Sequence, residues 1–151
     1  MKKAALALAV AVSALASPLA AWSQATPVGL WKTIDDETKK EKSLVRITES
    51  GGVITGRIEK LLDPTAKADA VCEECRDERK GKPVVGLEII RGVKKSEDTD
   101  NRWDGGQILD PANGKTYKVR LTPADGGKKL DVRGYIGAPM LGRTQTWIRV
   151  E

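Results

Sequence analysis

Turn signals at short, nearly regular intervals constrain the fold of this chain more than any other feature. Clusters of Gly, Pro, Asn and Asp separate segments in which apolar and polar residues alternate, a pattern typical of half-buried β-strands. Beyond residue 25 no helical period of 3.6 residues persists over a useful length. The pattern predicts an all-β, antiparallel sandwich or barrel. The expected strands are Val28–Ile34, Ser43–Glu49, Val53–Leu62, Val84–Val93, Arg102–Asp110, Lys115–Thr122, Lys128–Ile136 and Leu141–Val150.

Related aromatic motifs stand at the two ends of this patterned region. Gly29-Leu30-Trp31 opens it and Thr146-Trp147-Ile148-Arg149 closes it. A sheet that closes into a barrel places its first and last strands side by side, so the rings of Trp31 and Trp147 and the guanidinium of Arg149 can plug one end. The two ends therefore favour a closed, up-and-down barrel of about eight strands, with Gly29 at the closure.

Alternation also predicts which side chains face the interior. The opposite faces of the same strands carry mostly charged residues, whereas the last strand is mixed on both faces and its core side is not predicted. The expected inward sets are Ile54, Ile58 and Leu62; Val85, Leu87 and Ile89; Tyr117, Val119 and Leu121; and Leu130, Val132 and Ile136.

The N-terminus has the three parts of a bacterial secretory signal. Lys2 and Lys3 precede an uncharged apolar run over residues 4–16, and small residues end the segment at Ala25. The run is too short to cross roughly 30 Å of hydrocarbon. We expect cleavage after Ala25, a periplasmic or secreted protein with no membrane span, and one domain over residues 26–151.

Charge and composition exclude several function classes. Loss of Lys2 and Lys3 lowers the formal net charge from +5 to +3, and basic residues are interleaved with acids, so no nucleic-acid partner is expected. The chain contains no histidine, which removes Ser-His and Cys-His nucleophile pairs and most catalytic zinc sites. We therefore expect a protein that is not an enzyme and carries no cofactor.

Cys72 and Cys75 lie in the longest interruption of the strand pattern, Asp63–Pro83. A redox pair needs a stabilised thiolate, which Glu73 and Glu74 between the two sulfurs disfavour. A zinc site usually takes four Cys or His ligands, and the chain has two Cys and no His. A redox pair and a zinc site completed by other ligands are the less favoured interpretations, and the favoured one is a local disulfide formed in an oxidising compartment, with no metal.

Three arginines lie next to a glycine, which allows another group to approach closely: Arg57, Arg133 and Arg143. They either point into the barrel mouth and bind an anionic head group, or face solvent and pair with acids on neighbouring strands. Trp103 precedes Asp104-Gly105-Gly106 and is a candidate for the rim. The candidate ligand-binding residues are Arg57, Trp103, Arg133, Tyr135, Arg143 and Gln145.

Seven motifs, taken in order, span nearly all of the chain after the expected cleavage site. They are Gly29-Leu30-Trp31, Thr55-Gly56-Arg57-Ile58, the Cys72-to-Cys75 loop leading into Gly81-Lys82-Pro83-Val84-Val85-Gly86-Leu87, Gly106-Gln107-Ile108-Leu109-Asp110-Pro111, Gly114-Lys115-Thr116-Tyr117, Leu130-Asp131-Val132-Arg133-Gly134-Tyr135 and Leu141-Gly142-Arg143-Thr144-Gln145-Thr146-Trp147. As a set they resemble the secreted bacterial family catalogued as domain of unknown function 2147. The resemblance implies a lipocalin-like, calycin-type barrel in which Trp31 and Arg149 take the roles of the lipocalin Gly-x-Trp tryptophan and late arginine. It implies a small-ligand cavity and no particular ligand or activity.

An enzyme that uses Glu or Asp without His is the least favoured function, and two other functions are preferred. The first is binding of a small or amphipathic ligand inside the barrel. The second is a structural or interaction role in the envelope, in which a filled barrel presents the Asp63–Pro83 loop to a protein partner. The state of the barrel interior separates the two, because an interior filled by aliphatic side chains leaves no room for a ligand.

Overall fold

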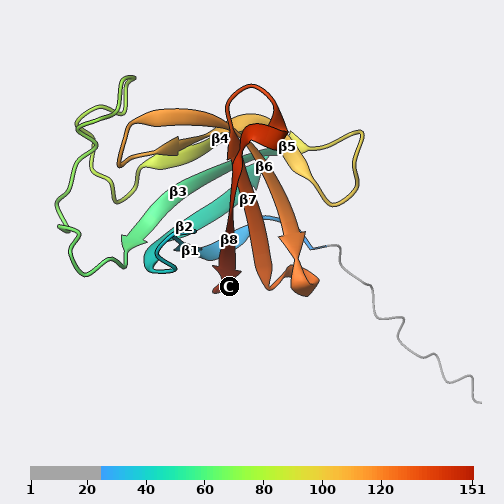
Figure 1. The fold of residues 1–151 in the computed structure, drawn as a ribbon, viewed down its shortest axis with the longest axis horizontal. Helices are drawn as coiled ribbons and strands as arrows, with labels where there is room; N and C mark the ends of the chain where they lie inside the picture. Colours follow the sequence, from blue (N-terminus) through green and yellow to red (C-terminus); the bar gives the residue numbers. More distant parts are fainter. Residues whose placement is uncertain (1–24) are drawn as a thin grey trace, which may run out of the picture.

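The computed structural model describes residues 25–151. The expected signal peptide therefore lies almost wholly outside the described residues. Eight strands and two short 3₁₀ turns make up the fold (Figure 1). They are β1 (Gly29–Ile34), β2 (Glu41–Ser50), β3 (Val53–Leu61), β4 (Glu88–Lys95), β5 (Trp103–Asp110), β6 (Lys115–Ala124), η1 (Asp125–Gly127), β7 (Lys129–Tyr135), η2 (Pro139–Leu141) and β8 (Arg143–Arg149).

Each strand pairs antiparallel with the next, and β8 returns to pair with β1 through Trp31 opposite Arg149 and Lys32 opposite Ile148. The result is a closed up-and-down barrel, as the sequence predicted. All eight expected strands are present. The largest boundary error concerns β4, which begins at Glu88 and not at Val84.

Two of the predicted inward residues are wrong for local backbone reasons. Val85 is 40% exposed because the chain turns at Gly86, which has a φ of +92°. Ile136 is 64% exposed because β7 ends one residue earlier and Gly137, at a φ of +79°, turns the chain away. β8 likewise starts at Arg143, since Pro139–Leu141 forms a 3₁₀ turn.

Side chains fill the barrel interior. Inward-facing residues of β1, β2, β3, β4, β6 and β7 include side chains with 0% exposure, and such a side chain has no water-sized void beside it. Trp103 and Trp147 are 5% and 2% exposed and complete the packing. The residues with 0% exposure in the strands are Trp31, Val45, Ile47, Ile54, Ile90, Val93, Val119, Leu121 and Leu130.

Trp31 and Arg149 close one end of the barrel. The Arg149 Cζ lies 4.2 Å from the centre of the Trp31 ring, and the guanidinium donates hydrogen bonds to the carbonyls of Gly127, Val28 and Thr26 at 2.5, 2.8 and 2.7 Å. Burial lowers the pKa of Arg149. The Trp31 indole N–H donates to the Pro27 carbonyl at 2.7 Å.

Gly29 is required where the closing strands meet. Its φ is +143°, and a Cβ there would lie 2.4 Å from the Glu151 carbonyl oxygen and 2.5 Å from Arg149 Nη1. A larger residue would therefore push the last strand away from the first.

Truncation of the closing ring should destabilise the whole fold. We predict that Trp31→Ala lowers the free energy of unfolding by about 3–5 kcal/mol, because it removes a large, fully buried side chain. Met140→Ala, at a position 82% exposed, should change it by less than about 0.5 kcal/mol. Urea unfolding followed by fluorescence measures both. Equal stability of the two variants would show that the ring does not close the barrel.

Candidate functional site

The up-and-down topology gathers four loops at one end of the barrel, called here the loop end. These loops are residues 35–40, 62–87, 111–114 and 136–142. Residues 25–28, Glu151 and the three connections 51–52, 96–102 and 125–128 lie at the opposite end, next to the Trp31–Arg149 closure. Any site built from long loops therefore belongs to the loop end.

The disulfide loop, residues 62–87, is folded against the barrel. Cys72 and Cys75 are bonded to each other with their Cα atoms 5.5 Å apart, and both are buried in the main hydrophobic cluster. A Cβ on Gly114 would lie 1.8 Å from the Glu74 carbonyl oxygen, so the cysteine turn packs directly on the 111–114 turn. Among residues 25–151 no group of three or more His, Cys, Asp and Glu side chains could hold a metal ion.

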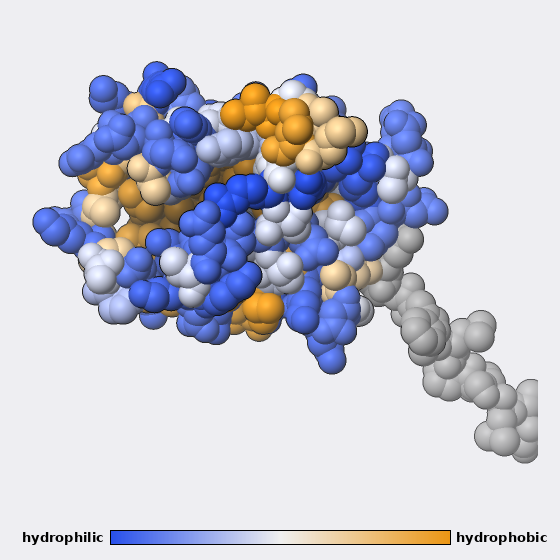
Figure 2. Space-filling model, in the orientation of Figure 1, coloured by the Kyte–Doolittle hydropathy of each residue, from blue (hydrophilic) through white to orange (hydrophobic). Residues whose placement is uncertain are grey.

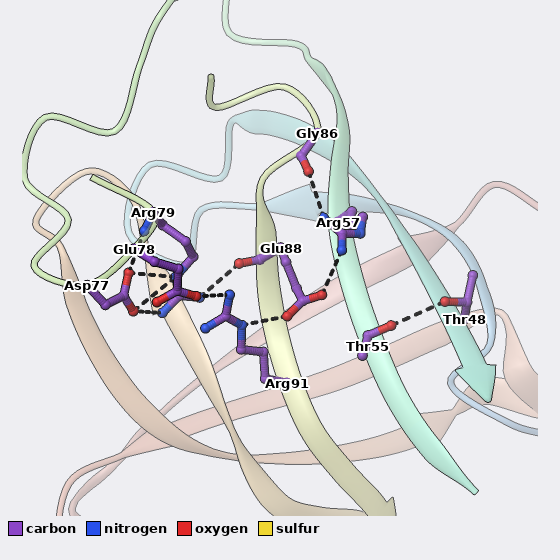
Figure 3. Close-up of polar contacts among 9 residues, drawn as sticks. All are labelled: Thr48, Thr55, Arg57, Asp77, Glu78, Arg79, Gly86, Glu88 and Arg91. Carbon is purple, nitrogen blue, oxygen red and sulfur yellow. Dashed lines mark hydrogen bonds and ion pairs between the residues drawn. The ribbon is translucent and has the colours of Figure 1, made fainter. Parts of the chain in front are cut away.

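Arg79 ties this loop to β4 (Figure 3). Its side chain is only 5% exposed and pairs with Asp77, Nη2 to Oδ2 at 2.6 Å, while Nη1 donates to the Glu88 carbonyl at 2.8 Å. The Arg79 side-chain hydrogen bonds lower the pKa of Asp77 from 3.8 to about 2. At neutral pH the Asp77 carboxylate is therefore charged, and its ion pair with Arg79 helps to hold the disulfide loop against β4.

Two further arginines, Arg57 and Arg91, donate hydrogen bonds to the Glu88 carboxylate, as Figure 3 shows. Arg57 donates to its carboxylate at 2.9 Å and to the Gly86 carbonyl at 3.2 Å. Arg91 donates to the other carboxylate oxygen at 2.5 Å and also pairs with Glu78 of the loop. Arg57, a candidate ligand residue from the sequence, thus lies on the outer face of β3 and fastens the loop.

The other candidates are spread over the barrel. Arg143 binds the 35–40 loop by donating to Asp36 at 2.7 Å and to Glu37 at 2.9 Å, and these acids raise its pKa, Asp36 most. Gln145 accepts a hydrogen bond from the Trp147 indole at 3.1 Å. Trp103 is 5% exposed and belongs to the buried cluster. The structure does not bring these three to one site.

Only Arg133 and Tyr135 of the candidate set lie together, on the outer face of β7. The sequence analysis missed their partner Arg120, whose Cζ lies 5.6 Å from the centre of the Tyr135 ring. The alternation of apolar and charged residues along β6 puts Arg120 on the charged, outward face, and this pattern was the sequence signal that could have identified it. Arg120 and Arg133, together with the 96–102 loop, line an open hollow of about 390 Å³, which is called here the outer groove. Its lining is Thr99, Asp100, Asn101, Arg102, Arg120, Thr122, Asp131, Arg133 and Thr144.

A second open hollow, of about 510 Å³, lies at the loop end and is called here the loop-end hollow. It is lined by Arg76, Asp77, Gly114, Lys115, Thr116 and Ile136. Ile136 belongs to an apolar tip on the 136–142 loop, where Met140 and Leu141 are 82% and 74% exposed. Figure 2 shows an apolar patch at the top of the molecule, over this loop.

Strand order, closure and a filled core of alternating residues define a lipocalin-like barrel. The chain belongs to the bacterial family described as "Uncharacterized protein conserved in bacteria (DUF2147)", which matches residues 29–149. It is also similar to a solved structure described as "Protein HP1028 from the human pathogen Helicobacter pylori belongs to the lipocalin family". The TM-score is 0.71 at 22% identity, over 84% of each chain. These matches confirm the resemblance and the predicted fold.

No curated protein matches the chain. Over residues 25–151 no helix is long and apolar enough to cross a membrane.

The anchoring of the disulfide loop should depend on acid pH through Asp77. A carboxyl whose pKa is lowered in the folded state stabilises that state fully above 3.8, and the stabilisation is lost as the pH falls through about 2. We predict that at pH 4 pepsin cuts the 76–87 segment more slowly in the native protein than in Asp77→Asn. At pH 2 the rates should converge.

Asp63 provides the matched control for this experiment. Its pKa is also about 2, but the main cause is the hydrogen bond from the Thr65 side chain, so Asp63→Asn should leave cleavage within 76–87 unchanged. Equal cleavage of the native protein and Asp77→Asn at pH 4 would show that Asp77 does not hold the loop.

Proposed function

We propose that this protein is a periplasmic or secreted binding protein, without catalytic activity, that captures a small amphipathic anion in the loop-end hollow. The observation that carries the proposal is a filled barrel beside a hollow that combines cations with an exposed apolar side chain. The ligand is therefore held at the mouth of the barrel and not in its interior, where the sequence analysis had placed it.

The apolar half of the ligand would rest on Ile136. Its side chain is 64% exposed and lines the hollow, so covering it removes apolar surface from water. The neighbouring apolar side chains of Met140 and Leu141 continue the tip of the same loop. A short alkyl chain or ring system fits such a strip.

The anionic half would meet Arg76 and Lys115. Both are exposed and line the hollow, and neither side chain is held by an ion pair within residues 25–151. The one acid in the lining, Asp77, is already paired with Arg79, so its charge is largely compensated. The volume of about 510 Å³ lies in the usual range for small-molecule sites.

The disulfide supports an extracytoplasmic location, because such bonds persist in oxidising compartments. A secretory signal over residues 1–25 would supply the route.

A second candidate is recognition of an envelope protein by the disulfide loop. It is favoured by Val71 and Val85, which are 41% and 40% exposed on a loop whose other side is fixed by the disulfide and Arg79. A photo-crosslinking residue placed at Val71 should then join one partner in cells, and the same residue at exposed Lys60 should not.

Calorimetric titration with dodecanoate tests the leading proposal. We expect dodecanoate to bind and acetate not to bind. Ile136→Ser should weaken binding about tenfold or more, and Arg76→Ala combined with Lys115→Ala should weaken it and remove its salt dependence. Ile148→Ser and Lys129→Ala are the controls, because both side chains are exposed on strands away from the hollow. Binding that Ile136→Ser does not weaken would contradict the proposed site.

A further inference from the structure

Two arginines stand directly opposite each other on the outer face of the sheet. Arg120 of β6 and Arg133 of β7 are register partners, and like charges in this arrangement destabilise a sheet. No ion pair holds either guanidinium among residues 25–151. The outer groove therefore holds two neighbouring cations that have no direct ion pair with an acid among the described residues.

Neutral contacts hold both arginines in place. Arg133 donates from Nε to the Pro139 carbonyl at 2.7 Å and from Nη1 to the Thr144 hydroxyl at 2.8 Å, and its Nη2 makes no hydrogen bond within the described chain. Arg120 lies against the Tyr135 ring, and its Nε is buried without an acceptor among the described residues. Neutral groups thus position the N–H donors of both guanidiniums.

The 96–102 loop forms a fixed wall over the groove. Asn101, at a φ of +57°, donates from its side chain to the Pro123 carbonyl at 2.9 Å. Arg102 also lines the groove but pairs with Asp104 at 2.9 Å. Two carboxylates complete the lining, Asp100 and Asp131, and Asp131 accepts from the Thr146 hydroxyl at 2.8 Å.

We propose that the outer groove binds a phosphate monoester whose organic part carries hydroxyl groups, such as a sugar phosphate. Two guanidiniums facing one space match the three terminal oxygens of a phosphate ester better than the two oxygens of a carboxylate. The carboxylates of Asp100 and Asp131 can accept hydrogen bonds from the hydroxyl groups of the organic part of the ligand. A volume of about 390 Å³ suits a molecule of this size.

Calorimetric titration with glucose 1-phosphate, inorganic phosphate and glucose tests the proposal. Glucose 1-phosphate should bind with an affinity that falls as salt rises, and glucose alone should not bind. If inorganic phosphate binds more weakly than glucose 1-phosphate, the result supports a sugar phosphate as the ligand. Equal binding of inorganic phosphate supports the phosphate site with the free anion as its ligand. Absence of binding for both phosphates up to about 10 mM overturns the proposal.

Arg120→Gln is the decisive variant. It should weaken glucose 1-phosphate binding about tenfold or more, whereas Arg46→Gln should not, since Arg46 lies on β2 and is paired with Glu59. Without ligand, Arg120→Gln should be at least as stable as the native protein, because it removes the like-charge pair. Unchanged binding, or a clear loss of stability in the free variant, would assign Arg120 a structural role instead. Dodecanoate binding should be unaffected by Arg120→Gln, so this proposal and the loop-end proposal fail independently.

Discussion

The contact between Arg149 and Trp31 is the interaction on which the rest of the structure depends. β1 and β8 share two register pairs, and backbone hydrogen bonds between Leu30 and residues 150 and 151 continue this pairing. The guanidinium covers the Trp31 ring and donates hydrogen bonds to the carbonyls of residues 26, 28 and 127. These bonds join the last strand to the segment before β1 and to the 125–128 turn. Closure also removes the exposed edges that an open sheet of these strands would present.

A closed barrel with a filled interior leaves the outer surface and the loops as places for the proposed binding. The inward side chains are almost completely buried, and both hollows lie outside the barrel interior. The loop end is made rigid by polar groups: Arg79 and Asp77 fix the disulfide loop to β4, and Arg143 fixes the 35–40 loop to β8. Rigid loops lose less conformational entropy when they bind a ligand.

The sequence predicted the strands and their closure because these depend on local patterns. Alternation with a period of two identifies strands, and the motifs at the two ends identify the closure. Val85 and Ile136 were wrongly predicted to face the interior. In each case the next residue is a glycine at positive φ, where the chain turns although the apolar pattern of the sequence continues up to it. Two roles were open for Arg57 and Arg143, the barrel mouth or pairing with acids. The structure shows the pairing, with acids far away in the sequence on β4 and in the 35–40 loop.

The pairing of Arg120 with Arg133 was likewise beyond a local analysis. It depends on the register between β6 and β7, which no short motif encodes. The same holds for the packing of the cysteine turn on Gly114, which links two loops separated by most of β4 and β5.

A crystal of the protein pressurised with xenon tests the central claim, a filled and closed barrel, most directly, because xenon occupies apolar cavities that are otherwise empty. The account predicts no ordered xenon atom within the strand cage among Val45, Val119 and Leu121. An ordered xenon atom among those side chains would show a cavity in the interior and would return the ligand site to the inside of the barrel.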